Sequence, residues 1–352
     1  MTSAPLTRGV SLLAIALLTA CGTESHTATL ETAAFVPPAA RLAADVDQFS
    51  DWATPVNLGP VVKSSPVNLE VAISKDGLSL YIASNRSGNF DIWVSRRASV
   101  DKPWGPPQNL GPVINTSARE QAPLLTLDGH RMYFFSDRPA GFGGTDLYVS
   151  RRPDKRDDFG WQTPVNLGGG VNASANETLP VLFEDDETGT TTLYFNSNRT
   201  GQPDVYASTL QRDGTFGPAV CVEELSSPRR DRILSIRRDG LEIFLASDRP
   251  GPTASPSDLW VSTRASTSDP WSTPVNLGPV VNSTADEGSA LLSFDETALY
   301  FTSNRPGGSG GYDLYVSTRT KLKAGRRGGQ PGHPDVDARA ERRRGCGGER
   351  SP

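Results

Sequence analysis

Cysteine and histidine are scarce in this sequence of 352 residues, which contains three of each. Three cysteines are too few for a disulfide framework. His26 and His333 lie outside the segments with strand patterning, His130 follows a predicted turn, and Cys221 stands alone in a predicted strand. The sequence therefore predicts neither a Ser-His-Asp or Cys-His catalytic set nor a His/Cys metal site. We expect no metal and no cofactor.

Charge of one sign and long apolar runs are also lacking. The formal net charge is -5, which is too small to argue for a nucleic-acid partner. The apolar stretch at 10–18 is far shorter than the roughly 20 residues that a transmembrane helix needs. It follows Arg8 and ends in L-T-A-C at residues 18–21. A positive residue, a short apolar stretch and small residues before a cleavage point are typical of a signal peptide.

The L-T-A-C tetrad resembles the lipobox of bacterial lipoproteins, in which Cys21 becomes the lipidated first residue of the mature protein. This resemblance implies that residues 1–20 are a lipoprotein signal peptide and that a lipid anchor replaces a transmembrane helix. Gly22, in place of Asp, implies transfer to the outer membrane, where the protein faces the periplasm or the exterior. The alternative is ordinary secretion with a free cysteine.

Two segments beside the patterned region 51–319 lack strand or helix periodicity. Residues 21–50 are rich in Ala, Thr and Pro, so we expect a flexible tether. Residues 320–352 are rich in Lys, Arg and Gly and contain no aromatic residue. Such a basic tail cannot bury enough apolar surface to fold. Contact of the tail with anionic lipid or nucleic acid, and a shifted reading frame, are the alternatives.

The region between these segments consists of one unit repeated five times. Each unit opens with W-x-x-P-V-N-L-G or a degraded copy of it, and then contains an apolar strand, a tight turn, an aromatic strand, a Gly/Pro turn and D-L-Y-V-S. The units begin at Trp52, Trp104, Trp161, Phe216 and Trp271. Four short strands per unit at this period are typical of propeller blades. The sequence thus predicts an all-β fold, a five-bladed β-propeller of four-stranded antiparallel blades.

Turn and strand signals place the elements within a unit. In the second unit we predict strands at 122–126, 131–136 and 146–151, and an outer strand beginning near Trp161. The first two strands are joined by Asp128-Gly129, a strong hairpin signal that also occurs at Asp76-Gly77 and Asp239-Gly240. The aromatic strand has apolar residues on both faces, as expected when neighbouring blades cover both faces.

The phase of the repeat predicts how the ring closes. The patterned region begins with an outer strand at 52–58 and ends with a third strand at 313–319. We expect the N-terminal strand to complete the last blade, which removes two exposed sheet edges. The repeated Trp residues either pack between blades, which we favour, or form sugar-stacking platforms.

Residues 74–86, S-K-D-G-L-S-L-Y-I-A-S-N-R, and 303–317, S-N-R-P-G-G-S-G-G-Y-D-L-Y-V-S, resemble the WD40-like propeller repeat of the TolB type. The resemblance covers all five units and implies a propeller, without implying an activity. TolB itself has six blades and an additional α/β domain, and neither is predicted here. The partners of TolB are therefore not carried over to this chain.

One repeated position suggests a binding site. Eight residues before the first turn of each unit, four of five residues are acidic: Asn68, Glu120, Glu177, Asp231 and Glu287. Because this position directly precedes the innermost strand, we expect these side chains to surround one mouth of the central channel. A ring of carboxylates raises the local negative potential and binds a cation or a basic peptide.

Two further repeated sets suggest structural bracing, because an arginine fork fits a carboxylate. The arginines are Arg86, Arg138, Arg199, Arg249 and Arg305. The aspartates are Asp91, Asp146, Asp204, Asp258 and Asp313. We expect both sets to stabilise the turn between the second and third strands. The channel-mouth acids also fit this bracing role.

These observations favour a binding protein over an enzyme. We expect a monomeric, envelope-anchored propeller that contacts a protein or glycan partner, touches the membrane only through its lipid and binds no nucleic acid. The alternative is a carbohydrate-active hydrolase with carboxylates such as Glu120, Glu177 and Asp231 at the channel mouth. A pure scaffold within an envelope complex is a third possibility.

Overall fold

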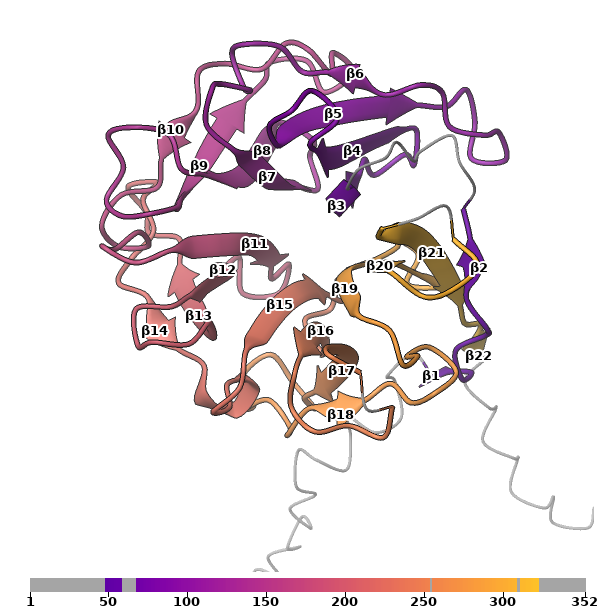
Figure 1. The fold of residues 1–352 in the computed structure, drawn as a ribbon. Coiled ribbons are helices and arrows are strands. Elements are labelled where there is room, and N and C mark those ends of the chain that lie inside the picture. The colour runs from indigo at the N-terminus through magenta and orange to yellow at the C-terminus, as the bar shows by residue number, and fades with distance from the viewer. Residues whose placement is uncertain (1–47, 59–67, 254, 309–310, 323–352) are drawn as a thin grey trace, which may run out of the picture. The chain divides into compact units, whose positions relative to one another are not determined.

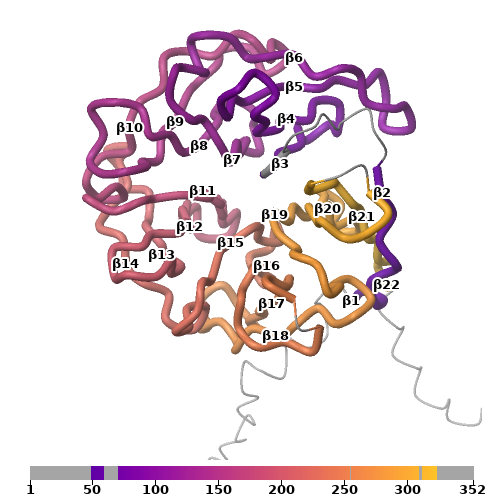
Figure 2. The backbone as a smooth tube through the Cα atoms, in the orientation of Figure 1, coloured from indigo at the N-terminus to yellow at the C-terminus, as the bar shows by residue number. Residues whose placement is uncertain are grey.

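The computed structural model describes residues 48–58, 68–253, 255–308 and 311–322. All of them belong to one unit of the chain, 39–352. Their strands form five sheets arranged around a central axis (Figure 1), and the path of the chain passes from one sheet to the next around the ring (Figure 2). The predicted five-bladed propeller is confirmed. Cys21 and most of the predicted tether and tail lie outside the described residues.

Each blade is an antiparallel sheet of four strands, with the first strand nearest the axis. Blade 1 contains β3 (Asn68–Ile73), β4 (Ser79–Ser84), β5 (Asp91–Arg96) and β6 (Gln108–Asn109). Blade 2 contains β7 (Glu120–Leu125), β8 (Arg131–Ser136), β9 (Asp146–Arg151) and β10 (Val165–Asn166). Blade 3 contains β11 (Glu177–Glu184), β12 (Thr191–Ser197), β13 (Asp204–Thr209) and β14 (Val220–Cys221). Blade 4 contains β15 (Asp231–Ile236), β16 (Glu242–Ser247), β17 (Asp258–Thr263) and β18 (Val275–Asn276). Blade 5 contains β19 (Glu287–Leu292), β20 (Ala298–Ser303), β21 (Asp313–Thr318) and β2 (Val56–Asn57).

Two strand pairings join the ends of the ring, and the first of them was predicted from the phase of the repeat. β2 pairs with β21, with Val56 opposite Val316, and so completes blade 5. β1 (Gln48–Phe49) also pairs with β22 (Lys321–Leu322). This second pairing extends the closure a few residues beyond the region 51–319 in which strands were expected. The edge of β21 is thereby covered.

The outer strands are shorter than the motif suggested. In blades 1, 2, 4 and 5 a proline directly precedes the two-residue strand, at Pro107, Pro164, Pro274 and Pro55. Because proline has no N–H, the ladder with the third strand is interrupted there. The residue after the tryptophan restores one ladder bond, as in Gln162 N–H to Arg151 O at 2.8 Å.

Every innermost strand contains a register shift near its start. In three blades the residue at the shift has a positive φ: Ala122 at 51°, Leu179 at 52° and Ser289 at 40°. Such a bulge bends the strand and redirects a side chain. The corresponding residue of blade 1 is Glu70, which lines a small axial cavity together with these three.

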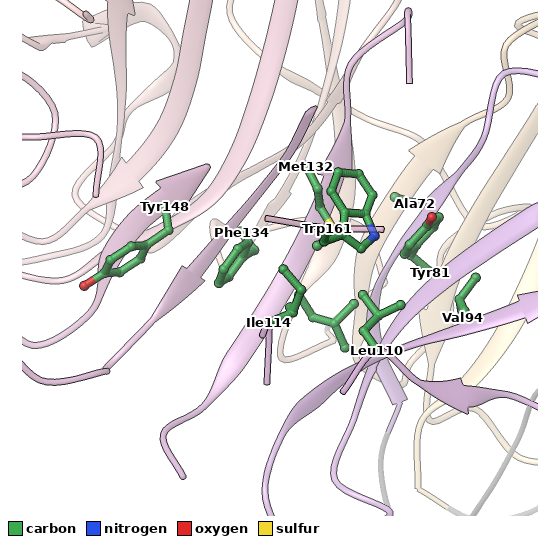
Figure 3. Packing of buried hydrophobic residues seen from close by; sticks show 10 residues of the cluster. Ala72, Tyr81, Val94, Leu110, Ile114, Met132, Phe134, Tyr148 and Trp161 are labelled. Atoms are coloured by element: carbon green, nitrogen blue, oxygen red, sulfur yellow. The ribbon is translucent and has the colours of Figure 1, made fainter. Parts of the chain in front are cut away.

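The hydrophobic core consists of five clusters, one at each blade interface of the described residues. Figure 3 shows the interface of blades 1 and 2, where Tyr81 and Val94 face Met132, Phe134 and Trp161. Trp161 meets Tyr81 edge-on at 6.2 Å between ring centroids. Three other units repeat this contact with the preceding blade, in Trp271–Tyr194, Phe216–Tyr133 and Trp52–Phe244. Trp104 packs against the cluster between blades 5 and 1. The tryptophans thus pack between blades, as we favoured.

Candidate functional site: carboxylate clasps and axial channel

The four repeated carboxylates begin the innermost strands and are completely buried. Glu120, Glu177, Asp231 and Glu287 each have 0% relative exposure. The register places each of them opposite the serine that ends the second strand, and that serine lies opposite the aspartate that begins the third strand. One end of every blade therefore carries a row of polar residues. We name this end of the channel the carboxylate end. The opposite end, which carries the turns between the first and second strands of the blades, is named the turn end.

Glu120 shows how such a carboxylate is bound. Its Oε1 accepts hydrogen bonds from Thr116 Oγ1 at 2.7 Å, Ser136 Oγ at 3.1 Å and Arg138 Nη2 at 3.1 Å. Its Oε2 accepts one from the Thr116 N–H at 2.9 Å. The arginine also donates to Ile114 O at 2.9 Å and stacks 4.8 Å from the Tyr148 ring centroid. Burial raises the pKa of Glu120, and these donors partly oppose that effect.

The same carboxylate clasp occurs in three further blades. The arginine-to-carboxylate distance is 3.1 Å for Arg199–Glu177 and 3.0 Å for Arg305–Glu287, and Arg249 contacts Asp231 through two nitrogens. In blade 1 the acid is replaced by Asn68, whose side chain lies outside the described part. There Arg86 Nε donates to Ser84 Oγ at 3.0 Å. Arg138, Arg199, Arg249 and Arg305 thus pair with the acids that begin the innermost strands, one of the two sets of acids that the bracing prediction considered.

The turn aspartates have other partners. Asp91, Asp146 and Asp258 each accept a hydrogen bond from an asparagine of the P-V-N-L-G motif or its variant, namely Asn109, Asn166 and Asn276, at 2.8, 3.0 and 2.8 Å. In blade 3, Cys221 replaces this asparagine, and Asp204 accepts a hydrogen bond from Thr200 Oγ1 at 2.6 Å. Asp313 begins β21 and is buried, as Asp91, Asp146 and Asp258 are. Asp91, Asp146 and Asp258 therefore bind the outer strand of their blade. Four of the five aspartates also accept a hydrogen bond from their own turn, as expected for bracing, and the donors are Ser87 Oγ, the Phe142 N–H, Thr200 Oγ1 and Ser255 Oγ.

A second asparagine, which the sequence analysis did not single out, joins this network to the next blade. Asn115 donates to Asn109 Oδ1 at 2.8 Å and to Ile92 O at 2.9 Å, and it accepts from the Ile92 N–H at 2.8 Å. Its neighbour Thr116 binds Glu120 of the following blade. Two consecutive residues of the linker are therefore bound to two different blades. Asn172 and Asn282 repeat this arrangement.

The placement of the strand-start acids leaves little for a ligand. Their oxygens accept hydrogen bonds from the protein's own hydroxyls, N–H groups and arginines, and no part of these residues is exposed. A binding role for Asn68, Glu120, Glu177, Asp231 and Glu287 stays a prediction. The repeat shows which residues occupy equivalent positions in the five units. It does not show which of these repeated positions are in contact with each other in the folded blade.

Glu70 is the carboxylate that faces the axis. It lines a cavity of about 40 Å³ with Ala122, Leu179 and Ser289, and its buried Oε2 has no hydrogen-bond partner among the described residues. Burial raises the pKa of Glu70 to about 7, opposed by the charge of Arg232 and a hydrogen bond from the Ala122 N–H. Sequence reasoning missed it, because no other unit has an acid at this position.

The described residues offer no metal-binding group of three or more His, Cys, Asp or Glu. Cys221 is a partly exposed free thiol. Among the helical segments that the structure describes, none is long and apolar enough to cross a membrane.

The sequence matches no protein-family model, and no curated protein resembles it in sequence. Solved structures match in fold. A GH62 α-L-arabinofuranosidase catalytic domain from Coprinopsis cinerea is 14% identical with a TM-score of 0.54, and the match covers 78% of this chain and 98% of that one. An endo-arabinase from Bacteroides thetaiotaomicron is 18% identical with a TM-score of 0.50, covering 78% and 99%.

TolB proteins are also among the matching structures, in line with the resemblance of the repeats. TolB from Acinetobacter baumannii is 13% identical with a TM-score of 0.45, and the match covers 73% of this chain and 56% of that one. Identities this low show a shared propeller fold and nothing finer. The fold by itself does not choose between a binding protein and a hydrolase, and that choice depends on the site.

Proposed function

We propose that this protein is a non-enzymatic binding propeller of the bacterial envelope, which contacts a protein or glycan through the carboxylate end of its ring. The observation that carries the proposal is the clasping of the four repeated carboxylates. Glycoside hydrolysis needs two carboxyl groups that face the scissile bond from opposite sides. Acids that are wholly buried against arginines stabilise the ring and do not form such a pair.

Exposed apolar side chains at the carboxylate end support a contact with a macromolecule. Val113 and Val280, in two of the linkers, are 47% and 51% exposed, and Phe142, in the turn between β8 and β9, is 54% exposed. Exposed apolar residues are common singly. Here three of them lie on loops at the same end of three blades.

The test is affinity capture from native envelopes with the full chain as bait. A Phe142→Ser variant should lose the captured partner. Val165→Ser is the matched control, because Val165 is 64% exposed on the outer strand β10 and should retain the partner. Equal capture by both variants and the parent would count against the carboxylate end as the contact surface.

Attachment to the envelope rests on the lipobox-like tetrad at 18–21. Cys21→Ser should release the protein from the membrane fraction, because the thiol that would carry the lipid is gone. Retention of the variant in that fraction would refute the lipid anchor without affecting the binding role.

A hydrolase is the second candidate, favoured by Glu70. A carboxyl group with a pKa near 7 in an axial cavity has the property that a general acid needs at neutral pH. Matching propellers include an α-L-arabinofuranosidase from Podospora anserina in complex with cellotriose and a GH62 hydrolase in complex with xylotriose. The full chain should therefore be incubated with arabino-, xylo- and cello-oligosaccharides. Turnover that Glu70→Gln abolishes would establish the hydrolase and overturn the non-enzymatic proposal.

A further inference from the structure

A larger axial cavity lies at the turn end, opposite the carboxylate clasps. Its volume is about 610 Å³, and all five blades contribute to it through the ends of their innermost strands and the turns that follow. This volume lies in the range of pockets that take small organic ligands. Glu70 does not line this cavity, although Leu124 and Leu291 line both this cavity and the smaller one. The cavity lies at the opposite end from the surface proposed for a macromolecular partner.

The wall of this cavity is largely apolar. Leu125, Leu182, Ile236 and Leu291 line it from blades 2, 3, 4 and 5, and each keeps part of its surface exposed. Apolar surface that remains accessible inside a concave site gains free energy when a ligand covers it. The wall therefore fits the apolar part of a ligand.

The rim of the cavity carries an exposed aromatic ring between two cations. Phe294, in the turn of blade 5, is 37% exposed. Lys75 Nζ of blade 1 and the Arg238 guanidinium of blade 4 each lie 5.3 Å from its ring centroid. Two positive groups from the flanking blades thus converge on one apolar side chain.

The residues that line the cavity include four cations and four acids, and two of the acids are bound within their own turns. Asp76 accepts hydrogen bonds from Ser74 Oγ at 2.6 Å and the Leu78 N–H at 3.0 Å, within its own turn. Asp295 is held in the same way by Ser293 Oγ at 2.6 Å and the Thr297 N–H at 3.2 Å.

Among the charged groups of the cavity, Lys75 and Arg238 are the exposed cations at the rim. Glu296 pairs with Lys321 at 3.1 Å, Arg237 pairs with Asp239 at 2.6 Å, and Arg97 donates to backbone oxygens. Glu184 of blade 3 also lines the cavity, and the cation whose charge acts on it is Arg131. Arg238 has one exposed contact, with Asp186 at 3.4 Å. Among the described residues, Lys75 has no carboxylate in ion-pair contact.

We propose that the turn-end cavity binds a small amphipathic anion. Its apolar chain or ring lies against Leu125, Leu182 and Ile236, and its anionic group lies beside Lys75 and Arg238 at the rim. Lys75 and Arg238 are both exposed, so their positive charge is accessible to a ligand at the rim and favours an anionic head group. The site stands whether or not a macromolecular partner binds at the carboxylate end.

The test is calorimetric titration of the full chain with two ten-carbon amphiphiles below their micelle-forming concentrations. Decanoate should bind saturably with one site per chain, and decyltrimethylammonium should bind about tenfold more weakly or not at all. Lys75→Glu should reverse this order. Lys102→Glu is the matched control, because Lys102 is an exposed lysine of the same blade that does not line the cavity, and it should leave both affinities unchanged.

A second variant tests the apolar part of the site. Phe294→Ser removes an exposed ring whose loss should not prevent folding, and it should weaken decanoate binding while the melting temperature is retained. The absence of saturable decanoate binding to the parent chain would overturn the proposal. So would equal affinity for the two amphiphiles, or equal effects of Lys75→Glu and Lys102→Glu. None of these results bears on capture of an envelope partner.

Discussion

Single glycines fix how closely neighbouring blades approach. Gly240, in the first turn of blade 4, has a φ of +71°, and a Cβ there would lie 2.3 Å from Cζ of Phe183 in blade 3. We expect Gly240→Ala to lower the free energy of unfolding by about 2–4 kcal/mol, from the left-handed backbone and from overpacking. Urea denaturation measures this change.

Gly189 supplies a control for the backbone contribution. It also has a positive φ, +67°, but a Cβ there meets nothing within 4 Å. Gly189→Ala should therefore lower the free energy of unfolding by only about 1 kcal/mol. Adding Phe183→Leu to Gly240→Ala should restore part of the loss, since the two residues are in contact. Equal losses for both alanine variants would contradict the packing argument.

Protonation of Glu70 should make stability depend on pH near neutrality. The pKa of this carboxyl is raised from 4.5 to about 7 in the folded protein, so between these values the folded state binds the additional proton. Stability conferred by the proton is fully present below pH 4.5 and is lost as the pH rises through 7. Thermal melts at pH 5, 6, 7 and 8 should show a decline that Glu70→Gln reduces. Parallel profiles for the two proteins would refute the assignment.

At the scale of strands and turns, the carboxylate clasp should stabilise its blade far more than an exposed ion pair does. Arg138→Gln leaves the wholly buried carboxylate of Glu120 without its cation, and we expect a loss of about 3 kcal/mol in the free energy of unfolding. Arg119→Gln is the control in the same blade. Its pair with Asp137 is 49% and 30% exposed, so the loss should stay below about 1 kcal/mol. Similar losses would show that the clasp does not brace the blade.

Sequence periodicity predicted elements well where local signals agree. Strands β8 and β9 have the predicted bounds, because alternating apolar residues lie between clear turn signals. β7 begins two residues before the predicted start, at Glu120, and then contains a bulge. A bulge changes the side-chain period in the middle of a strand, and alternation alone does not reveal it. Proline likewise shortened the outer strands.

The candidate site was only partly predictable. The repeat singled out Arg138 and Glu120, but their pairing depends on a turn that folds the arginine back over the end of its own blade. Asn115 is repeated as well, yet its role follows from linker geometry. Glu70 and Phe294 occur in one unit each, so comparison of the units gives them no weight. Comparison of the repeats detects residues that the units share, so it does not detect the residues that distinguish one blade from another.

At the scale of the whole ring, closure by the N-terminal strand should control stability. Deletion of residues 51–58 removes β2 and also Trp52, which meets Phe244 edge-on at 6.2 Å and lies 4.5 Å from the Arg319 guanidinium. We expect a loss of about 3 kcal/mol or more, as for removal of a large core aromatic residue. Calorimetry should show one lowered transition. Deletion of 323–352 is the control and should leave the midpoint unchanged, and an unchanged midpoint after both deletions would refute closure as a stabilising device.

The pairing of β1 with β22 brings Gln48 opposite Leu322. A short peptide could therefore join these positions, and the chain could be cut at an exposed hairpin such as that around Gly189. In the resulting circular permutant, the four strands of blade 5 would come from one continuous segment, with β22 and β1 between β21 and β2, and blade 3 would instead be assembled from both ends. The blade that combines strands from both ends of the chain is therefore set by the position of the termini. Circular permutation can move this role from one blade to another.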